Sequence, residues 1–301
     1  MYPIRINYII ATILLLTGML FGADADRAMP SIVTVEWLKA HYDDPHLVIV
    51  DVREPALFEK GHLEHAVNMP VFRDLFNKAL MLPKLDSLKE VFSKAGIDKD
   101  SLLVAYGDDQ MIWAARLYWV SEVLGHKKVG LLNVGYGNWK AGELPVTTAH
   151  YQPERKEFVP NIDHTILDTK LSVLMSIGKD VIVDGRPKAF YMGEKSHAKR
   201  YGHIPKAVNY PGHMNYEHNT KGSRLKSLEV LAEHYRGLPK NKKIILYCED
   251  GADAALNYII LKELGYKASV YEGSWLEWGN SLNLPIENPS KDLLENRKDH
   301  K

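Results

Sequence analysis

Cys248 is the residue of this 301-residue chain whose type and setting most suggest covalent chemistry. It is the only cysteine, it follows the apolar run 243–247, and the loop 249–253 leads into a helical pattern over 254–264 that Gly265 stops. Strand, loop and helix in this order place the thiol at the carboxyl end of a strand, where α/β sheets bind ligands. Backbone N–H groups at a helix N-terminus favour the thiolate, which is the nucleophilic form of cysteine. A buried structural cysteine is the alternative.

The N-terminus predicts export. Arg5 lies in a short polar start, residues 8–22 form an almost unbroken apolar run, and Ala23-Asp24-Ala25 has small residues at alternate positions, so residues 1–25 are interpreted as a secretory signal peptide. The run is short for a transmembrane helix. We expect an exported protein, periplasmic if the source is bacterial, with no stable membrane insertion after cleavage. An uncleaved leader that tethers the chain to the membrane is the alternative.

Composition argues for a globular protein that does not bind nucleic acid. The 38 Lys and Arg residues balance 38 Asp and Glu residues, so the formal net charge is +0 and there is no field to recruit a polyanion. The chain is 46% apolar and 25% charged, which is typical of folded domains. A single cysteine allows no intrachain disulfide, and in an oxidising compartment a retained thiol favours a chemical role.

The elements that would position the thiol occur in two copies. The apolar runs 47–51 and 181–184 both end in the aspartate of an Asp-x-Arg sequence. The segment Gly-His-Ile-Pro-Lys-Ala-Val-Asn at 202–209 matches Gly-His-Leu-Glu-His-Ala-Val-Asn at 61–68. Continuous apolar runs of this length are typical of strands buried in a parallel sheet. We therefore predict an α/β fold with two tandem domains, each a mostly parallel sheet flanked by helices. The predicted boundaries are domain 1 at 26–148, a Pro-containing linker at 149–165, domain 2 at 166–289 and a charged tail at 290–301.

Within the first copy the pattern is detailed enough to place individual elements. Further strands are predicted at 102–106 and 129–134, and helices at 34–41, with Thr34 as N-cap, and at 114–124. Three aromatic residues around this last helix are expected in the core or at a domain interface: Trp113, Tyr118 and Trp119.

Taken together, these motifs and Glu-Gly-Ser-Trp-Leu-Glu-Trp at 272–278 resemble the tandem-domain rhodanese family, the thiosulfate and 3-mercaptopyruvate sulfurtransferases. The resemblance covers nearly all of the chain after the leader. It implies two rhodanese-like domains, of which the second is catalytic. The first copy fits the inactive partner, because Tyr106-Gly107-Asp108-Asp109 occupies the equivalent turn without a thiol.

The resemblance also implies a reaction. Cys248 would take a sulfane sulfur from a small donor (thiosulfate, 3-mercaptopyruvate or polysulfide), become a persulfide, and pass the sulfur to cyanide, a thiol or a protein thiol by ping-pong catalysis. No metal or organic cofactor is implied. Arg186 matches the family arginine that faces anionic donors, and Arg200 is a second candidate; a structural ion pair is the alternative for both. The loop residues expected to cradle the sulfur are Glu249, Asp250, Gly251, Ala252 and Asp253.

The acidic character of this loop departs from the family pattern. Thiosulfate sulfurtransferases tend to carry basic residues after the cysteine, whereas Glu249, Asp250 and Asp253 stand here. These carboxylates oppose a thiolate and repel a dianionic donor, unless they point outward or cap the helix, for which Asp253 is the natural N-cap. Two alternatives to an enzyme stay open: a non-enzymatic periplasmic sulfur carrier, and a degenerate rhodanese-like interaction module. The missing arginine at the end of the loop argues against a cysteine phosphatase.

Histidines offer no metal site in the sequence. The pair His62 and His65 and the pair His213 and His218 lack the convergent partners that a metal ion needs. His62 and His203 occupy matching positions of the repeat and are expected to order a turn.

Overall fold

The computed structural model describes residues 29–142 and 144–291. The predicted signal peptide and most of the predicted tail lie outside these residues, so export and localisation stay predictions. Within the described ranges, no helix is both long and apolar enough to cross a membrane.

The first domain is built on a five-stranded sheet in which every neighbouring pair is parallel, with strand order β1-β6-β5-β2-β4. Its strands are β1 Ile32–Val33, β2 Leu47–Asp51, β4 Val67–Asn68, β5 Leu102–Tyr106 and β6 Val129–Leu132. The helices around it are α1 Val35–Ala40, α2 Pro55–Phe58, α3 Val71–Asp74, α4 Leu85–Lys94, α5 Ile112–Val123 and α6 Tyr136–Ala141. A short antiparallel pair, β3 His62–Leu63 with β7 Val146–Thr147, lies beside the sheet.

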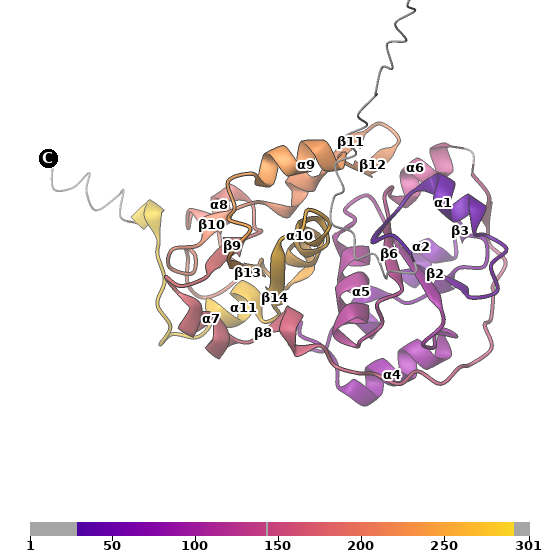
Figure 1. The fold of residues 1–301 in the computed structure, drawn as a ribbon, viewed down its shortest axis with the longest axis horizontal. Coiled ribbons are helices and arrows are strands. Elements are labelled where there is room, and N and C mark those ends of the chain that lie inside the picture. Colours follow the sequence, from indigo (N-terminus) through magenta and orange to yellow (C-terminus); the bar gives the residue numbers. More distant parts are fainter. Residues whose placement is uncertain (1–28, 143, 292–301) are drawn as a thin grey trace, which may run out of the picture.

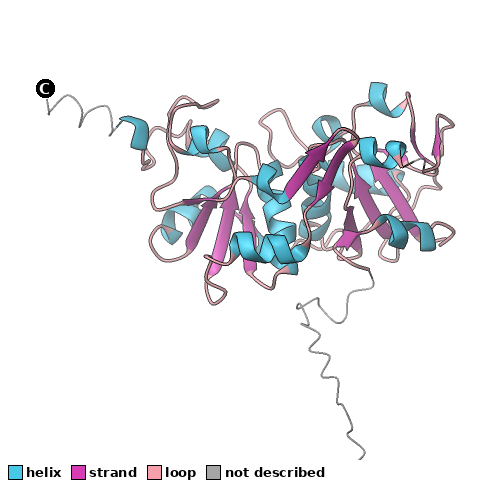
Figure 2. Ribbon diagram, turned by 90° about the horizontal axis from the view of Figure 1, so that it is seen from above, coloured by secondary structure: helices cyan, strands magenta, loops and turns pink. Residues whose placement is uncertain are grey.

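The second domain repeats this sheet. Its order β10-β9-β13-β14-β8 is the first order with the list reversed, and its neighbouring pairs are again parallel. Its strands are β8 Leu167–Asp168, β9 Val181–Asp184, β10 Val208–Asn209, β13 Lys243–Tyr247 and β14 Lys267–Tyr271. Its helices are η1 His164–Ile166, α7 Lys170–Ser176, α8 Lys188–Tyr191, η2 Gly212–Asn215, α9 Leu228–Tyr235, α10 Ala252–Glu263 and α11 Ser274–Trp278. Figure 2 shows the two sheets, with helices on both faces of each. The predicted fold class is confirmed.

Local signals placed the elements to within two residues. The strands predicted at 47–51 and 102–106 have those bounds, and the side chain of Thr34 caps α1 by accepting the N–H of Trp37 at 3.1 Å. The helices predicted at 114–124 and 254–264 both begin two residues earlier. The strand predicted at 129–134 ends at Leu132.

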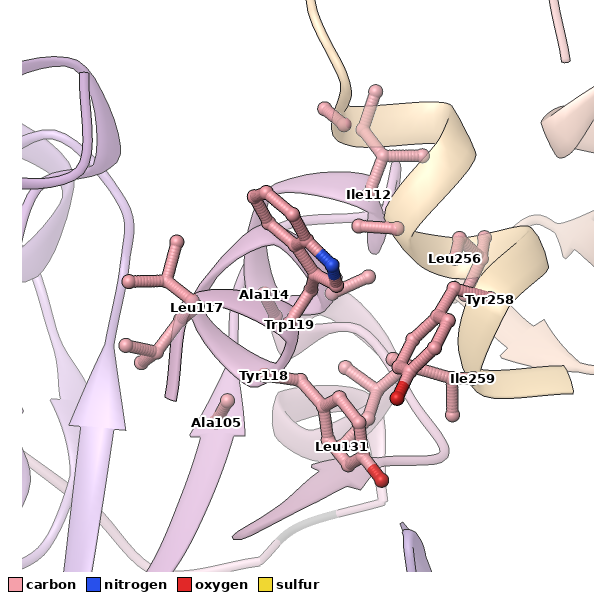
Figure 3. Close-up of a cluster of buried hydrophobic side chains, with 14 of the residues drawn as sticks. Ala105, Ile112, Ala114, Leu117, Tyr118, Trp119, Leu131, Leu256, Tyr258 and Ile259 are labelled. Carbon is pink, nitrogen blue, oxygen red and sulfur yellow. The ribbon is translucent and has the colours of Figure 1, made fainter. Parts of the chain in front are cut away.

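The two domains meet along α5 and α10, which lie side by side at the centre of the molecule (Figure 1). Both helices are buried around nearly their whole circumference, as expected of helices covered by a sheet on one side and by the other domain on the other. Figure 3 shows side chains of α5, among them Ile112, Tyr118 and Trp119, beside Leu256, Tyr258 and Ile259 of α10. The predicted interface or core role of Tyr118 and Trp119 is thus confirmed.

Polar contacts of Glu122 and a β-hairpin further fix the two domains to each other. Glu122 of α5 is fully buried and accepts hydrogen bonds from Tyr258 at 2.7 Å and Lys262 at 2.6 Å, both on α10. The hairpin of β11 Tyr216–Asn219 and β12 Gly222–Leu225 extends from the second domain to the first, where the Leu225 N–H donates to the Asn133 carbonyl at 3.0 Å. The thiol loop at the start of α10 is therefore held against the first domain.

Candidate active site

Cys248 follows β13, which pairs with β9 on one side and β14 on the other, so the thiol lies at the carboxyl edge of the sheet. Its side chain is fully buried. The Gly251 N–H donates to Cys248 Sγ at 3.1 Å, and the Cys248 N–H donates to the hydroxyl of Ser274 at 3.1 Å. Gly251 has φ +94°, a conformation that favours glycine and that turns its N–H back toward the sulfur. One N–H of the loop thus contacts the sulfur, and a cradle formed by residues 249–253 for a transferred sulfur stays a prediction.

The start of α10 differs from the prediction. Gly251 is the N-cap residue, not Asp253, which lies in the first turn. Asp250 takes over part of the capping, because its Oδ1 accepts the Ala252 N–H at 3.1 Å, and the same oxygen lies 4.0 Å from Cys248 Sγ. Asp253 instead packs on η2, where a side chain added at Gly212 would place its Cβ 2.5 Å from Asp253 Oδ1.

The carboxylates shape the electrostatics of the loop. Burial, followed by Asp250 and Asp253, raises the pKa of the Cys248 thiol well above its usual value, and backbone N–H groups only partly oppose this. Burial and the neighbouring carboxylates also raise the pKa of Asp253 to about 7. Burial raises the pKa of Glu249 to about 7 as well, although Arg186 acts in the opposite direction. Two carboxyl groups around the thiol therefore titrate near neutral pH.

Arg186 is held in a buried ion pair. Its Nε and Nη2 bind the two carboxylate oxygens of Asp184 at 3.0 and 2.7 Å, and Nη2 also donates to the Gly202 carbonyl at 2.7 Å. The Tyr247 hydroxyl donates to the same carboxylate at 2.7 Å. The guanidinium also stacks over Trp275, 4.3 Å from the ring centre. This network orders the Asp-x-Arg loop next to the cysteine.

The first domain has the same network without a thiol. Arg53 binds Asp51 at 2.9 and 2.5 Å and the Gly61 carbonyl at 2.8 Å, and the Tyr106 hydroxyl donates to Asp51 at 2.6 Å. A structural role thus explains most contacts of Arg186. The neighbour of Nη1 is particular to the second domain: Arg186 Nη1 is buried without a hydrogen-bond partner in the described part of the chain and lies 3.9 Å from Glu249 Oε2 of the cysteine loop. Donor binding by Arg186 would use this group.

Arg200 is occupied by backbone. Its guanidinium donates to four carbonyl oxygens at the end of α11 and in the chain that follows, at 2.6 to 3.2 Å, those of Trp278, Gly279, Ser281 and Leu284. These contacts give Arg200 a structural role, through backbone carbonyls and not through the ion pair that the sequence offered as the alternative. Substrate binding by Arg200 stays a prediction without a contact that supports it.

The two repeat histidines order turns, as expected. His62 stacks on Phe58 with ring centres 3.6 Å apart and bonds the Phe58 carbonyl at 2.9 Å through Nδ1. His203 does the same with Tyr191, at 3.9 Å between ring centres and 2.7 Å to the carbonyl.

Three residues at the site were missed from the sequence. Ser274 holds the Cys248 amide, while Arg116 and Glu272 form a buried ion pair at 2.9 Å between α5 and the end of β14. Arg116 could have been noticed in the sequence, because it is the one charged residue in the otherwise apolar segment Ala114 to Val120. Its partner 156 residues away could not be identified from local patterns.

Comparison with known proteins gives one family for both halves. The family described as "Rhodanese-like domain" matches residues 34–142 and 168–281. Among curated relatives, the sulfur carrier protein TtuD of Thermus thermophilus is 33% identical over 276 residues, which cover 85% of this chain and 95% of the relative. A thiosulfate sulfurtransferase of Corynebacterium glutamicum is 32% identical over 286 residues, covering 89% and 94%.

Solved structures agree with this family. The crystal structure of SseA from Escherichia coli, described in terms of the rhodanese fold and 3-mercaptopyruvate transfer, superposes with a TM-score of 0.72 at 26% identity and covers 82% of this chain and 99% of that one. The 3-mercaptopyruvate sulfurtransferase of Leishmania major, at 18% identity and a TM-score of 0.75, shares the fold.

Proposed function

The chain belongs to the rhodanese family and is a sulfurtransferase, and from this premise we propose that Cys248 carries the transferred sulfur as a persulfide. The observation that supports this most strongly is the Gly251 N–H, which donates to Cys248 Sγ at 3.1 Å from the start of α10. The turn of the first domain that matches this loop holds Asp108 and Asp109 and no thiol. The second domain is therefore the catalytic one in this proposal.

The reaction consists of two displacements. The Cys248 thiolate attacks the outer sulfur of thiosulfate or polysulfide, or the thiol sulfur of 3-mercaptopyruvate. The bond from that sulfur to the rest of the donor breaks, and the leaving group departs with the electron pair as sulfite, a shorter polysulfide or pyruvate enolate. The enolate then takes up a proton. A nucleophilic acceptor attacks the outer sulfur of the persulfide, and the Cys248 thiolate leaves. Asp250 Oδ1, 4.0 Å from Sγ, is placed to take the thiol proton before the first step.

The charge of the loop bears on the donor. Above neutral pH, Glu249, Asp250 and Asp253 would place up to three negative charges beside the thiol, which opposes a dianion such as thiosulfate more than a monoanion such as 3-mercaptopyruvate. We therefore propose 3-mercaptopyruvate in preference to thiosulfate, with Arg186 Nη1 as the donor-facing group. Cyanide, a small thiol or a protein thiol would be the acceptor, in the periplasm if the leader acts as predicted.

A sulfur carrier is the second candidate function. The relative named as a sulfur carrier protein and the complete burial of Cys248 favour it, since a buried persulfide is protected from solution thiols. Turnover distinguishes the two candidates. An enzyme converts many equivalents of donor when acceptor is in excess, whereas a carrier stops at one sulfur per chain until its protein partner is added. Cys248→Ser should abolish either behaviour.

A further inference from the structure

Arg116 brings a buried positive charge from the first domain to the cysteine loop of the second. Its side chain, on α5, is fully buried. Nη2 binds Glu272 Oε1 at 2.9 Å and lies 3.4 Å from the Leu75 carbonyl, and the guanidinium lies 4.3 Å from the centre of the Phe76 ring. Glu272 also accepts the Leu82 N–H. The guanidinium is thus fixed in place by contacts on one of its sides.

The other side of Arg116 faces the loop. Nε and Nη1 have no hydrogen-bond partner among residues 29–142 and 144–291, although both are fully buried. A side chain added at Gly251 would place its Cβ 2.9 Å from Arg116 Nη1. Gly251 is the residue whose N–H binds Cys248 Sγ. One residue therefore separates an unpaired, buried cationic donor from the sulfur. Such a donor costs stability, and its presence at this place calls for an explanation in function.

The charges around the thiol indicate what that use is. Acidic groups gather around the loop from three elements: Glu249, Asp250 and Asp253 within the loop and α10, Asp184 at the end of β9, and Glu272 after β14. The positive charges facing it are Arg186, already paired with Asp184, and Arg116, with His197 at the rim 3.6 Å from Glu249. In a site of low dielectric constant, the placement of one cation has a large effect on an anionic sulfur.

We propose that Arg116 is a positioning residue for sulfur transfer: through Gly251 it holds the cysteine loop and favours the anionic form of Cys248 and of its persulfide. This inference rests on the proposed function of Cys248. It means that the first domain, which lacks a nucleophile, completes the active site of the second. Glu272 limits the effect, because its carboxylate neutralises part of the guanidinium charge.

The test compares variants of one interdomain ion pair that change the charge at the loop in opposite senses. Arg116→Met removes the cation, whereas Glu272→Gln leaves the cation and removes its counter-charge. Glu122→Gln, in the ion pair with Lys262 on the same interface, is the control. Because Cys248 is buried, the rate at which iodoacetamide alkylates it at pH 8, followed by intact mass, is divided by the plateau rate of the same variant at high pH, which corrects for access to the sulfur. This relative rate reports the thiolate fraction and requires no sulfur donor, so it remains valid if the proposed function fails.

Arg116→Met should slow alkylation by about tenfold, which corresponds to a rise of about one unit in the pKa of the thiol. Glu272→Gln should speed alkylation by about threefold, which corresponds to a fall of about half a unit. Glu122→Gln should change it less than about twofold, and Arg116→Lys should lie between wild type and Arg116→Met, since it keeps the charge without the planar fork. Arg116→Lys decides the case if Arg116→Met does not fold. If Arg116→Met and Glu272→Gln shift the rate in the same direction, or if Arg116→Lys and Arg116→Met both match wild type, the positioning role is wrong.

Discussion

Arg186 Nη1 lies 3.9 Å from Glu249 Oε2, too far for a hydrogen bond, and is the one nitrogen of this guanidinium that the described residues leave without a partner. Arg186 therefore keeps one buried, unpaired N–H group beside the cysteine loop, and this is the group that we propose binds a donor carboxylate or sulfonate. The remaining contacts of Arg186 repeat those of Arg53 in the domain without a thiol, so fold and donor binding can be separated by treating the two arginines as a matched pair.

Lysine substitutions at Arg186 and Arg53 distinguish the effect on folding from the effect on donor binding. Arg186→Lys and Arg53→Lys should each lower the free energy of unfolding by about 2–4 kcal/mol, because lysine cannot bind a buried carboxylate bidentately. Only Arg186→Lys should raise KM for 3-mercaptopyruvate, by about tenfold, the value of one good charged contact. Denaturant titration and steady-state kinetics measure both effects. An equal rise in KM for Arg53→Lys would show that Arg186 acts only through the fold.

Thiosulfate should bind less well as pH rises. Glu249 and Asp253 both have pKa values of about 7, so between pH 6 and pH 8 the loop gains negative charge. A like charge at 4 Å costs about 1–4 kcal/mol between water and a protein surface, so KM for thiosulfate should rise by about tenfold over this range. The double variant with Glu249→Gln and Asp253→Asn should show a flat KM. If KM of the wild type did not change between pH 6 and pH 8, neither carboxylate would act on the bound donor.

The same carboxyl groups link stability to pH. Folding raises the pKa of Asp253 from its usual 3.8 to about 7, so the folded protein binds more protons than the unfolded chain between these values. The stability contributed by the protonated carboxyl is present below pH 3.8 and is lost as pH rises through 7. Asp253→Asn should therefore match wild type near pH 4 and be more stable by about 1–2 kcal/mol at pH 8. Thermal unfolding at several pH values tests this, and a difference that is constant with pH would contradict it.

Gly251 should tolerate no side chain without loss of transfer. Gly251→Ala forces alanine to φ +94° and places a Cβ against Arg116, so it should cost about 1–3 kcal/mol of stability and move the N–H away from Cys248 Sγ. Sulfur transfer should slow by more than about tenfold. Gly265→Ala is the matched control, because Gly265 also has positive φ, +77°, but no atom lies within 4 Å of the added Cβ. If both variants lost sulfur transfer equally, backbone strain alone would explain the loss, and the predicted role of the Gly251 N–H would be wrong.

The parts of the structure that could be predicted from the sequence are those with a local or repeated signal. The strand before Cys248 and the glycine after it were clear from a few adjacent residues, and the duplicated Asp-x-Arg and Gly-His segments identified two domains. The cap of α10 was assigned to Asp253 because aspartate is a strong N-cap residue, but the left-handed Gly251 begins the helix two residues earlier.

Long-range pairing set the limit of the sequence analysis. Arg116 and Glu272 are 156 residues apart, and their contact exists only because α5 packs on α10. Arg200 is a candidate donor-binding residue in the sequence because it precedes the Gly-His turn, whereas its guanidinium donates to four carbonyl oxygens about 80 residues later in the chain. No periodicity in the chain reports which backbone groups a distant arginine will meet.

The central claim is that Cys248 accepts and releases one sulfur atom. Intact-mass analysis of the protein after incubation with 3-mercaptopyruvate, polysulfide or thiosulfate, and again after addition of cyanide, tests it directly. We predict a gain of one sulfur atom that maps to Cys248, is absent in Cys248→Ser and is removed by cyanide with formation of thiocyanate. An unchanged mass with all three donors, in protein whose Cys248 still reacts with iodoacetamide, would contradict the claim and leave the interaction-module alternative.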